Sequence, residues 1–485
     1  MRRILPLLML VALAGTASCR KQPEGAVKVV VIGATPTLHE PAEGPLSASD
    51  QLLVGNVAQG LVRFDAGGNV VGGLAERWTV TDDGLSYIFR LAATNWPDGS
   101  KLTAQQVARL LKREIAGRSR NSLKDAFGAV EEVVAMTDRV IEINLTSPRP
   151  DLLSLLAQPQ MAIVRNGQGT GPFAGVRAKD GVIRLSREIV SLDDETTSRE
   201  QLLLAGASAP AAVQAFVAAN LDLVVGGSFA DLGFAQRVKL PRDALRFDPA
   251  SGLFGFVPTQ SGGPFDKPEI RQLLSEAIDR DTFVGALGVP GLASRATLLE
   301  SGLDGIPAPT APAWVATAYA DRVPGLQVQA NRLFGKSPKP TVRLALPDGP
   351  GADLLFQLLQ RDWGQLGLTV ERAQSPANAD LALVDEVAPS SSPSWFVRHF
   401  RCDRAAVCDP KADELMDGAR QSPVPAQRYA LLGQAAALID GGQLFIPIAA
   451  PVRWSLVSAR IQNFAGNRYA RHTLTDLEAR ASTGG

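Results

Sequence analysis

The sequence has few of the residues that catalysis and metal binding require. Its 485 residues include three histidines and three cysteines, and the histidines lie far apart at 39, 399 and 472. It contains no HExxH, GxSxG or GxxxxGKS/T segment and no cysteine and histidine spacing suited to zinc. These absences predict a protein that is not an enzyme and that holds neither a cofactor nor a metal ion.

The sequence also lacks an excess of charge. Lysine and arginine number 49, as do aspartate and glutamate, and aromatic residues make up 6% of the chain. Without a basic stripe there is no surface for a phosphate backbone, so nucleic acid is excluded as a partner. The length exceeds the roughly 300 residues at which single cores stop growing, which predicts two or three domains.

The N-terminal apolar run is too short to span a bilayer. It covers residues 4–14, follows a basic start and leads through small residues to Cys19. This order is typical of a signal peptide over 1–18, a lipidated Cys19 and a polar tether over 19–26. Thr16 stands where such signals prefer leucine, so ordinary signal cleavage and a soluble periplasmic product remain the alternative.

Two cysteines remain once Cys19 is assigned to a lipid. Export would place Cys402 and Cys408 in an oxidising compartment, and the spacer of CDRAAVC suits a short local loop. We therefore predict a disulfide between them. A metal site that uses both thiols and His399 is the alternative, although no fourth ligand is near in sequence.

The stretch 54–113 predicts strands, glycine turns and one capped helix. Apolar and polar residues alternate in three runs that Asp-Gly turns separate, which favours an antiparallel meander. Thr103 and Gln106 form a capping-box pattern at the start of a helix that stops at Gly117. The three runs lie around 61–63, 78–80 and 87–91.

Two segments carry a likeness to a known family. LAERWTVTDDGLSYIFRL with WPDGSKLTAQQV, at 74–107, and PFDKPEIRQLLSEAIDRDTFV, at 264–284, follow a pattern much longer than a short motif. The chain resembles the family 5 solute-binding proteins of ABC importers, the dipeptide, oligopeptide and nickel-binding group. The resemblance implies an α/β fold with the two-lobed periplasmic binding protein type II architecture and an extra small domain.

The resemblance also implies a division of the chain, with crossovers between the lobes near 256–258 and 449–452. The expected parts are lobe I at 27–44, 163–256 and 450–485, a small β-rich subdomain at 45–162, and lobe II at 257–449.

The function implied by the resemblance is capture of a peptide or peptide-like solute between the lobes. The solute would pass to separate ABC permease and ATPase subunits, and the protein would be a monomeric, membrane-anchored lipoprotein of the periplasm. Three alternatives stay open: an envelope sensor or interaction lipoprotein with the same fold, an importer component for nickel or a metal chelate, and a hydrolase with an unrecognised site.

The expected ligand residues fall in two segments. Thr37, Leu38 and His39 stand where the family has a Thr-Leu-Asp-Pro-like segment at the cleft, although here His39 precedes Glu40 and Pro41. A solvated loop histidine is the alternative interpretation of His39.

The second segment follows the expected strand ADLALVD. Peptide-binding members carry an aspartate after this strand that holds the amino terminus of the peptide, and Pro389 stands about there in this chain. This departure suggests that the ligand is not a free peptide held in the usual way. Asp385 or Glu386 would meet a cationic or hydroxyl group, with Trp395 as an apolar or cation-π face. The alternative is that both acids are solvated.

Overall fold

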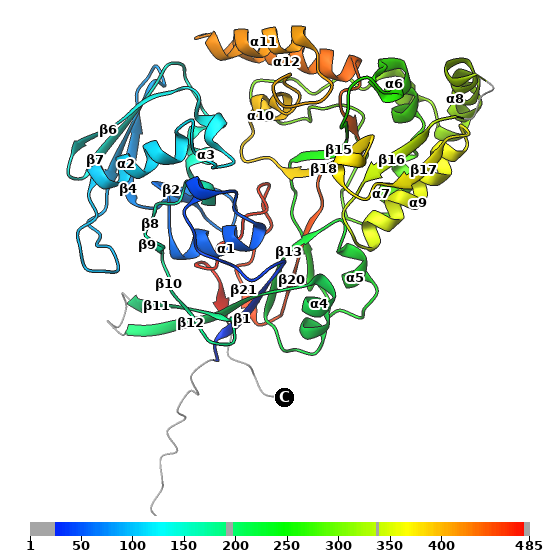
Figure 1. Cartoon of the computed structure of the whole chain (residues 1–485). Coiled ribbons are helices and arrows are strands. Elements are labelled where there is room, and N and C mark those ends of the chain that lie inside the picture. Colours follow the sequence, from blue (N-terminus) through cyan, green and yellow to red (C-terminus); the bar gives the residue numbers. More distant parts are fainter. Residues whose placement is uncertain (1–24, 191–196, 336–338, 480–485) are drawn as a thin grey trace, which may run out of the picture.

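A computed structural model describes residues 25–190, 197–335 and 339–479 of the protein. Two large sheets form the centres of two lobes, and a four-stranded sheet forms a small domain. In Figure 1 the small domain is at the upper left, the second lobe is at the right, and the sheet of the first lobe is at the bottom. No helix within the described ranges is both long and apolar enough to cross a membrane.

The first lobe is built on a seven-stranded sheet with the order β10-β11-β12-β1-β13-β20-β14. Strand β1, Val27–Ile32, lies between β12 and β13 and is parallel to both. Its apolar sequence VKVVVI suits a strand that is covered on both faces. The other strands are Ala174–Arg177 (β10), Ile183–Val190 (β11), Thr197–Ala207 (β12), Leu223–Ser228 (β13), Arg453–Val457 (β20) and Leu245–Phe247 (β14).

Helices cover both faces of β1. Helix α1, Ala48–Val57, packs on one face and α4, Ala209–Val217, packs on the other. The start of α1 is a capping box in which the Ser47 hydroxyl accepts a hydrogen bond from the Asp50 amide and the Asp50 carboxylate accepts one from the Ser47 amide. This box fixes the start of α1.

The small domain combines a sheet of order β4-β5-β7-β6 with helix α2, Ala104–Ile115. The predicted capping box of Thr103 and Gln106 is present, and the apolar stripe of α2 is buried against the sheet. The strands are Ala75–Val80 (β4), Ser86–Leu91 (β5), Val140–Leu145 (β7) and Val130–Thr137 (β6), and α3, Leu152–Leu156, follows them.

The first run of the predicted meander does not belong to this sheet. Strand β2, Val62–Phe64, pairs with β3, Val70–Gly72, in a separate two-stranded hairpin. The four-stranded sheet takes β6 and β7 instead, which follow α2 in the chain. The prediction of one meander was therefore wrong at its first strand, because a period-two pattern marks a strand without naming its partner.

The second lobe has a five-stranded sheet of order β17-β16-β18-β15-β19. Strand β16, Thr341–Ala345, and β17, Thr369–Arg372, are parallel, and α9, Pro350–Gly364, joins them, which confirms the predicted βαβ unit. The remaining strands are Leu381–Val387 (β18), Gly252–Pro258 (β15) and Ile446–Pro447 (β19).

The chain passes between the large sheets twice. It first leaves β14 at Phe247 and enters the second sheet at Gly252, whereas the sequence suggested a lobe boundary at 257. Residues 252–258 pair with β18 along their whole length, and Leu253, Phe254 and Phe256 of this strand are buried. The return runs from Pro447 to Arg453, over the stretch where the sequence predicts the second crossover.

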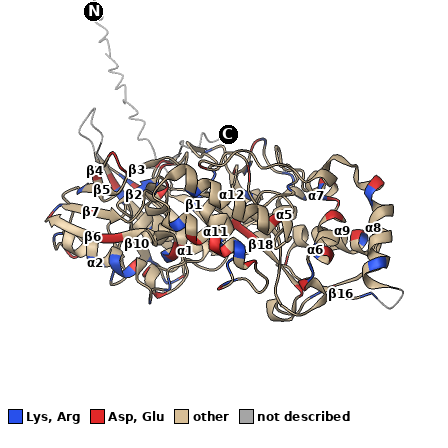
Figure 2. Ribbon diagram, turned by 90° about the horizontal axis from the view of Figure 1, so that it is seen from above, with Lys and Arg blue, Asp and Glu red and all other residues tan. Residues whose placement is uncertain are grey.

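Three helices stand between the small domain and the rest of the second lobe. They are α10, Pro393–Arg398, α11, Pro410–Gln421, and α12, Pro425–Gly441. Seen from above, α11 and α12 lie midway along an elongated molecule, with the small domain at one end and α8, Tyr319–Phe334, at the other (Figure 2). Acidic and basic residues are mixed along its length (Figure 2).

Candidate functional site

A cavity of about 120 Å³ lies between the small domain and the second lobe. One wall comes from residues 125–129, from Arg149–Asp151 and from α3, and the other comes from residues 390–395 and from helices α10, α11 and α12. Segments that are distant in the sequence meet here, so the cavity exists only when the small domain and the second lobe are together.

Trp395 forms an apolar part of the wall. It is the second residue after the initial proline of α10, and it is 7% exposed. Its ring contacts Phe396 edge to face at 5.0 Å between centroids, and His399 at 4.5 Å. These contacts hold the indole in place beside the cavity.

Seven charged side chains also line the cavity, and basic ones outnumber acidic ones. The lining contains Arg149, Arg398, Arg401, Arg420 and Arg428, together with Asp125 and Asp151.

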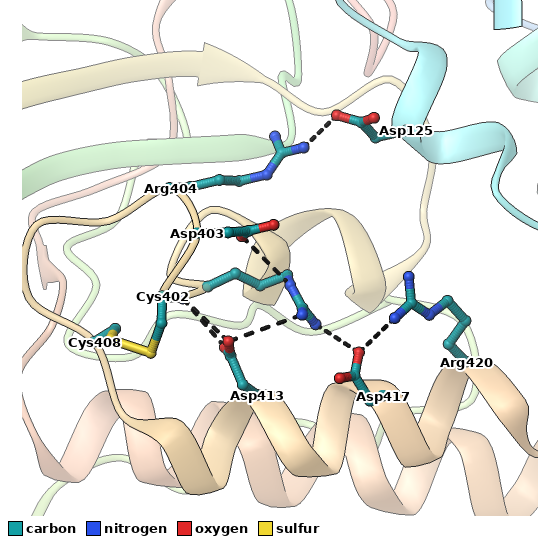
Figure 3. Close-up of polar contacts among 9 residues, drawn as sticks. Asp125, Cys402, Asp403, Arg404, Cys408, Asp413, Asp417 and Arg420 are labelled. Carbon is teal, nitrogen blue, oxygen red and sulfur yellow. Dashed lines mark hydrogen bonds and ion pairs between the residues drawn. A yellow bond between two sulfur atoms is a disulfide. The ribbon is translucent and has the colours of Figure 1, made fainter. Parts of the chain in front are cut away.

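Three of these charges are matched by partners (Figure 3). Arg401 and Arg420 share the carboxylate of Asp417, with N···O distances of 2.8 and 2.6 Å. Asp125 of the small domain pairs with Arg404 of the second lobe, so this ion pair joins the two walls.

Three arginines have no such match. Within the described residues, the side chains of Arg149 and Arg398 form no hydrogen bond and no ion pair. Arg428 donates to two backbone carbonyls, those of Pro148 at 2.6 Å and Ser422 at 2.9 Å. Burial lowers the pKa of Arg149, and the neighbouring Arg428 lowers it further. Burial also lowers the pKa of Arg398, and the charge of Arg404 lowers it further.

Among the described residues that line the cavity, Asp151 is the carboxylate that has no ion pair. The Ser390 hydroxyl donates a hydrogen bond to its Oδ2 at 3.0 Å, across the boundary between the small domain and the second lobe. Burial raises the pKa of Asp151, although this hydrogen bond opposes the shift. Asp151 can offset one positive charge of the three at most.

Further hydrogen bonds cross the same boundary. The side-chain amide of Gln158 donates to the carbonyl of Pro389 at 2.7 Å, and Arg428 of α12 donates to the carbonyl of Pro148. Together with the pairing of Arg404 and Asp125, they hold the two walls in contact.

A disulfide joins Cys402 and Cys408 beside this site (Figure 3). The Cys402 amide donates to the Asp413 carboxylate of α11 at 3.2 Å. The loop closed by the disulfide carries Arg404, so it positions the residue that contacts Asp125.

Residues 69–400 match the family of bacterial extracellular solute-binding proteins, family 5 Middle. The chain belongs to this family. A curated relative is the probable di/tripeptide-binding protein 5 of Pseudomonas aeruginosa, which is 25% identical over 85% of this chain and 88% of its own length.

Solved structures of solute-binding proteins have the same fold. The Haemophilus influenzae OppA complex with RPPGFSPFR matches with a TM-score of 0.80 and 17% identity over 94% of this chain and 100% of that one. The murein tripeptide binding protein MppA of Escherichia coli matches with a TM-score of 0.79 and 17% identity over 94% and 98%. Family and fold are those of binding proteins, and this solute-binding protein is of the type that serves ABC importers.

The expected ligand residues of the solute-binding protein do not converge on one cavity. Trp395 lines the cavity between the small domain and the second lobe, but Asp385 does not. The carboxylate of Asp385 is instead paired with Arg453 at 2.8 Å. Glu386 Oε2 lies 3.2 Å from His399 Nε2, and hydrogen bonding to His399 lowers the pKa of Glu386. Both acids therefore have partners within the chain.

Thr37, Leu38 and His39 lie in the segment before α1, and two of them contact Asp50 in the first turn of that helix. Thr37 donates to Asp50 from its amide and its hydroxyl, at 2.6 and 2.8 Å, and His39 Nε2 is 3.7 Å from Asp50 Oδ2. Thr37 and Leu38 line a different cavity, of about 530 Å³, which shares no residue with the one at Trp395.

Sequence reasoning missed Arg149, Asp151 and Arg398. The segment SPRPD does place two charges just before a leucine-rich helix, and that was an available signal. No pattern near Arg398 indicated that it lines the same cavity as Arg149. Cys19 and the expected signal peptide lie outside the described residues, and among the described ones no group of three or more metal-ligating side chains is assembled.

Proposed function

We propose that the protein binds a short peptide or peptide-like solute between its small domain and second lobe and delivers it to an ABC permease. The relatives named above support a peptide, since one is described as di/tripeptide-binding and another was solved with a peptide. The observation that carries the proposal is the cavity between the small domain and the second lobe, which combines an aromatic wall at Trp395 with charges of both signs.

We also propose that Cys19 is lipidated and that the protein acts as a monomer at the periplasmic membrane surface. The support is the N-terminal order of basic start, short apolar run and small residues before Cys19. In this arrangement the tether would keep the binding lobes near the permease.

Ligand screening tests the proposed function. Thermal-shift measurements would compare dipeptides to pentapeptides with amines, sugars and metal chelates, and calorimetry would follow each hit. We expect a peptide to raise the melting temperature and Trp395→Ala to weaken its binding by roughly tenfold or more. Trp314→Ala is the matched control, because Trp314 lines a different cavity in the second lobe.

The same screen also tests whether Asp385 or Glu386 contacts the solute, as the sequence suggests, or whether the solute binds at Trp395. Loss of a non-peptide ligand in Asp385→Asn or Glu386→Gln would favour direct contact by those acids. Peptide binding that survives both substitutions but not Trp395→Ala would place the solute in the cavity at Trp395. A screen in which no peptide binds would contradict the proposed function.

A further inference from the structure

Ser251 is bonded to both sides of the first crossover, residues 248–251. Its backbone amide donates to the carbonyl of Arg468 at 3.2 Å. Arg468 lies in the C-terminal segment after β20, and its neighbour Tyr469 stacks on Phe64 of β2. The carbonyl of Ser251 accepts a hydrogen bond from the amide of Ala388, which follows β18 of the second sheet, at 2.8 Å. A change in the angle between the lobes therefore acts on the bonds of this residue.

The side chain of Ser251 adds a bond to the second lobe. Its hydroxyl donates to Oε1 of Glu300. Glu300 follows Leu298 and Leu299, which are buried in one core with helix α12. Ser251 is 6% exposed and the Glu300 side chain is 9% exposed, so water competes little for this bond. A buried hydrogen bond to a carboxylate is among the stronger ones in a protein.

Arg295 connects the same carboxylate to the second crossover, residues 448–452. Its guanidinium forms an ion pair with Glu300 and donates to the carbonyl of Gly252 at 3.3 Å. Its backbone amide donates to the carbonyl of Ile448 at 2.8 Å. None of the side chains in this network lines the cavity proposed for the solute. Any effect of the network on solute binding therefore passes through the arrangement of the lobes.

We propose that Ser251 is a positioning residue of the first crossover, and that its bond to Glu300 favours the arrangement in which the small domain contacts the second lobe. We call this the joined arrangement. Because the Ser251 amide is bonded to the C-terminal segment, movement of the first lobe pulls the hydroxyl away from Glu300. A buried carboxylate then loses a donor, which makes separation of the lobes less favourable. This inference goes beyond the proposed function, because it holds whatever the solute is.

Two measurements on the full-length protein without solute test the proposal. Small-angle X-ray scattering detects loss of the joined arrangement as an increase in the radius of gyration. Cross-linking detects the joined arrangement even where it is the minor one. Asp125→Cys and Arg404→Cys place two thiols at a contact between the small domain and the second lobe. A short bis-maleimide should join these thiols at a rate proportional to the joined fraction.

Ser251→Ala should shift the equilibrium roughly tenfold towards separation. If the joined arrangement predominates in the wild type, the radius of gyration should rise. If the separated arrangement predominates, the rate of cross-linking should fall roughly tenfold. Unchanged scattering and unchanged cross-linking in Ser251→Ala would overturn the proposal.

Ser455→Ala is the matched control for loss of a buried hydroxyl. Ser455 is 1% exposed, and its hydroxyl has no hydrogen-bond partner among the described residues. The substitution should change neither the scattering nor the cross-linking. Changes equal to those of Ser251→Ala would overturn the proposal, because they would show that any lost hydroxyl loosens the fold.

A double-mutant cycle assigns the effect to the contact with Glu300. In a Glu300→Ala background, Ser251→Ala should have no further effect, because two residues that act through one contact are not additive. Additive effects would overturn the assignment. If Glu300→Ala does not fold by circular dichroism, the comparison of Ser251→Ala with Ser455→Ala still decides. Since no solute is used, failure of the proposed function leaves each of these outcomes unchanged.

Discussion

Asp385 and Arg453 form an ion pair that joins the two lobes beside the second crossover. Asp385 belongs to β18 of the second sheet, and Arg453 opens β20 of the first. Their Oδ1 and Nη1 atoms are 2.8 Å apart, and Arg453 Nη2 also donates to the Asp385 carbonyl at 2.9 Å. Both side chains are mostly buried, with exposed fractions of 17% and 18%.

Breaking this pair should destabilise the protein. Asp385→Asn leaves the Arg453 charge buried without a carboxylate, which typically lowers the free energy of unfolding by about 3 kcal/mol. Urea unfolding followed by circular dichroism measures the change. Arg343→Gln is the control, because Arg343 is 54% exposed in its 3.9 Å pair with Asp380 and should contribute less than about 1 kcal/mol. Equal effects of the two substitutions would contradict the structural role of Asp385.

The disulfide should stabilise the loop that carries Arg404. Replacing Cys402 and Cys408 together by serine should lower the free energy of unfolding by about 2 kcal/mol. This value is at the low end of the usual range for a disulfide because the closed loop is short. Mass spectrometry of protein isolated from the envelope, before and after reduction, should show a gain of one hydrogen on each sulfur. Free thiols in the native protein would refute the bond.

Cys19→Ser tests the lipid anchor. If Cys19 is acylated, the substitution should move the protein from the membrane fraction to the soluble fraction, because the tether has no other apolar attachment. Immunoblots of the two fractions measure the shift. Unchanged fractionation would indicate another anchor or a different cleavage site, and Cys402→Ser is the control for an effect of cysteine loss alone.

Glu114 should make the stability depend on pH. It is 2% exposed, receives a hydrogen bond from Asn121 at 3.0 Å, and burial raises its pKa from 4.5 to about 7. Between these values the folded state keeps a proton that the unfolded state releases, so stability falls as pH rises from 4.5 to about 7.

Glu114→Gln should remove this part of the pH dependence. Melting temperatures at about pH 5 and about pH 7.5 would show a smaller decrease in the variant than in the wild type. Glu76→Gln, at an exposed glutamate of the same domain, should keep the wild-type slope. A variant with the wild-type slope would show that Glu114 titrates near its ordinary pKa.

Local patterns determined those elements that the sequence predicted well. The run VKVVVI forms the inner strand β1, the box of Thr103 and Gln106 starts α2, and the alternating pattern at 342–346 begins a βαβ unit. Each depends on interactions within a few residues or on burial of one face, so short windows of sequence contain the signal.

Partners across the fold required the tertiary structure. The pattern around 61–63 marked a strand but not its pairing with β3, and the pattern of ADLALVD marked β18 but not the contact of Asp385 with Arg453. Both depend on how twisted sheets and loops bring distant segments together, which period-two alternation does not encode.

The sequence by itself determined the family, through two long segments whose local order is shared, and with it the two-lobed architecture. Only the tertiary structure decided which side chains line the cavity between the lobes. Arg149 and Arg398 are separated by about half of the chain, and their common surroundings arise where the small domain meets the second lobe. How far these two guanidinium groups are removed from water is a property of the folded state, and it depends on every segment packed around them.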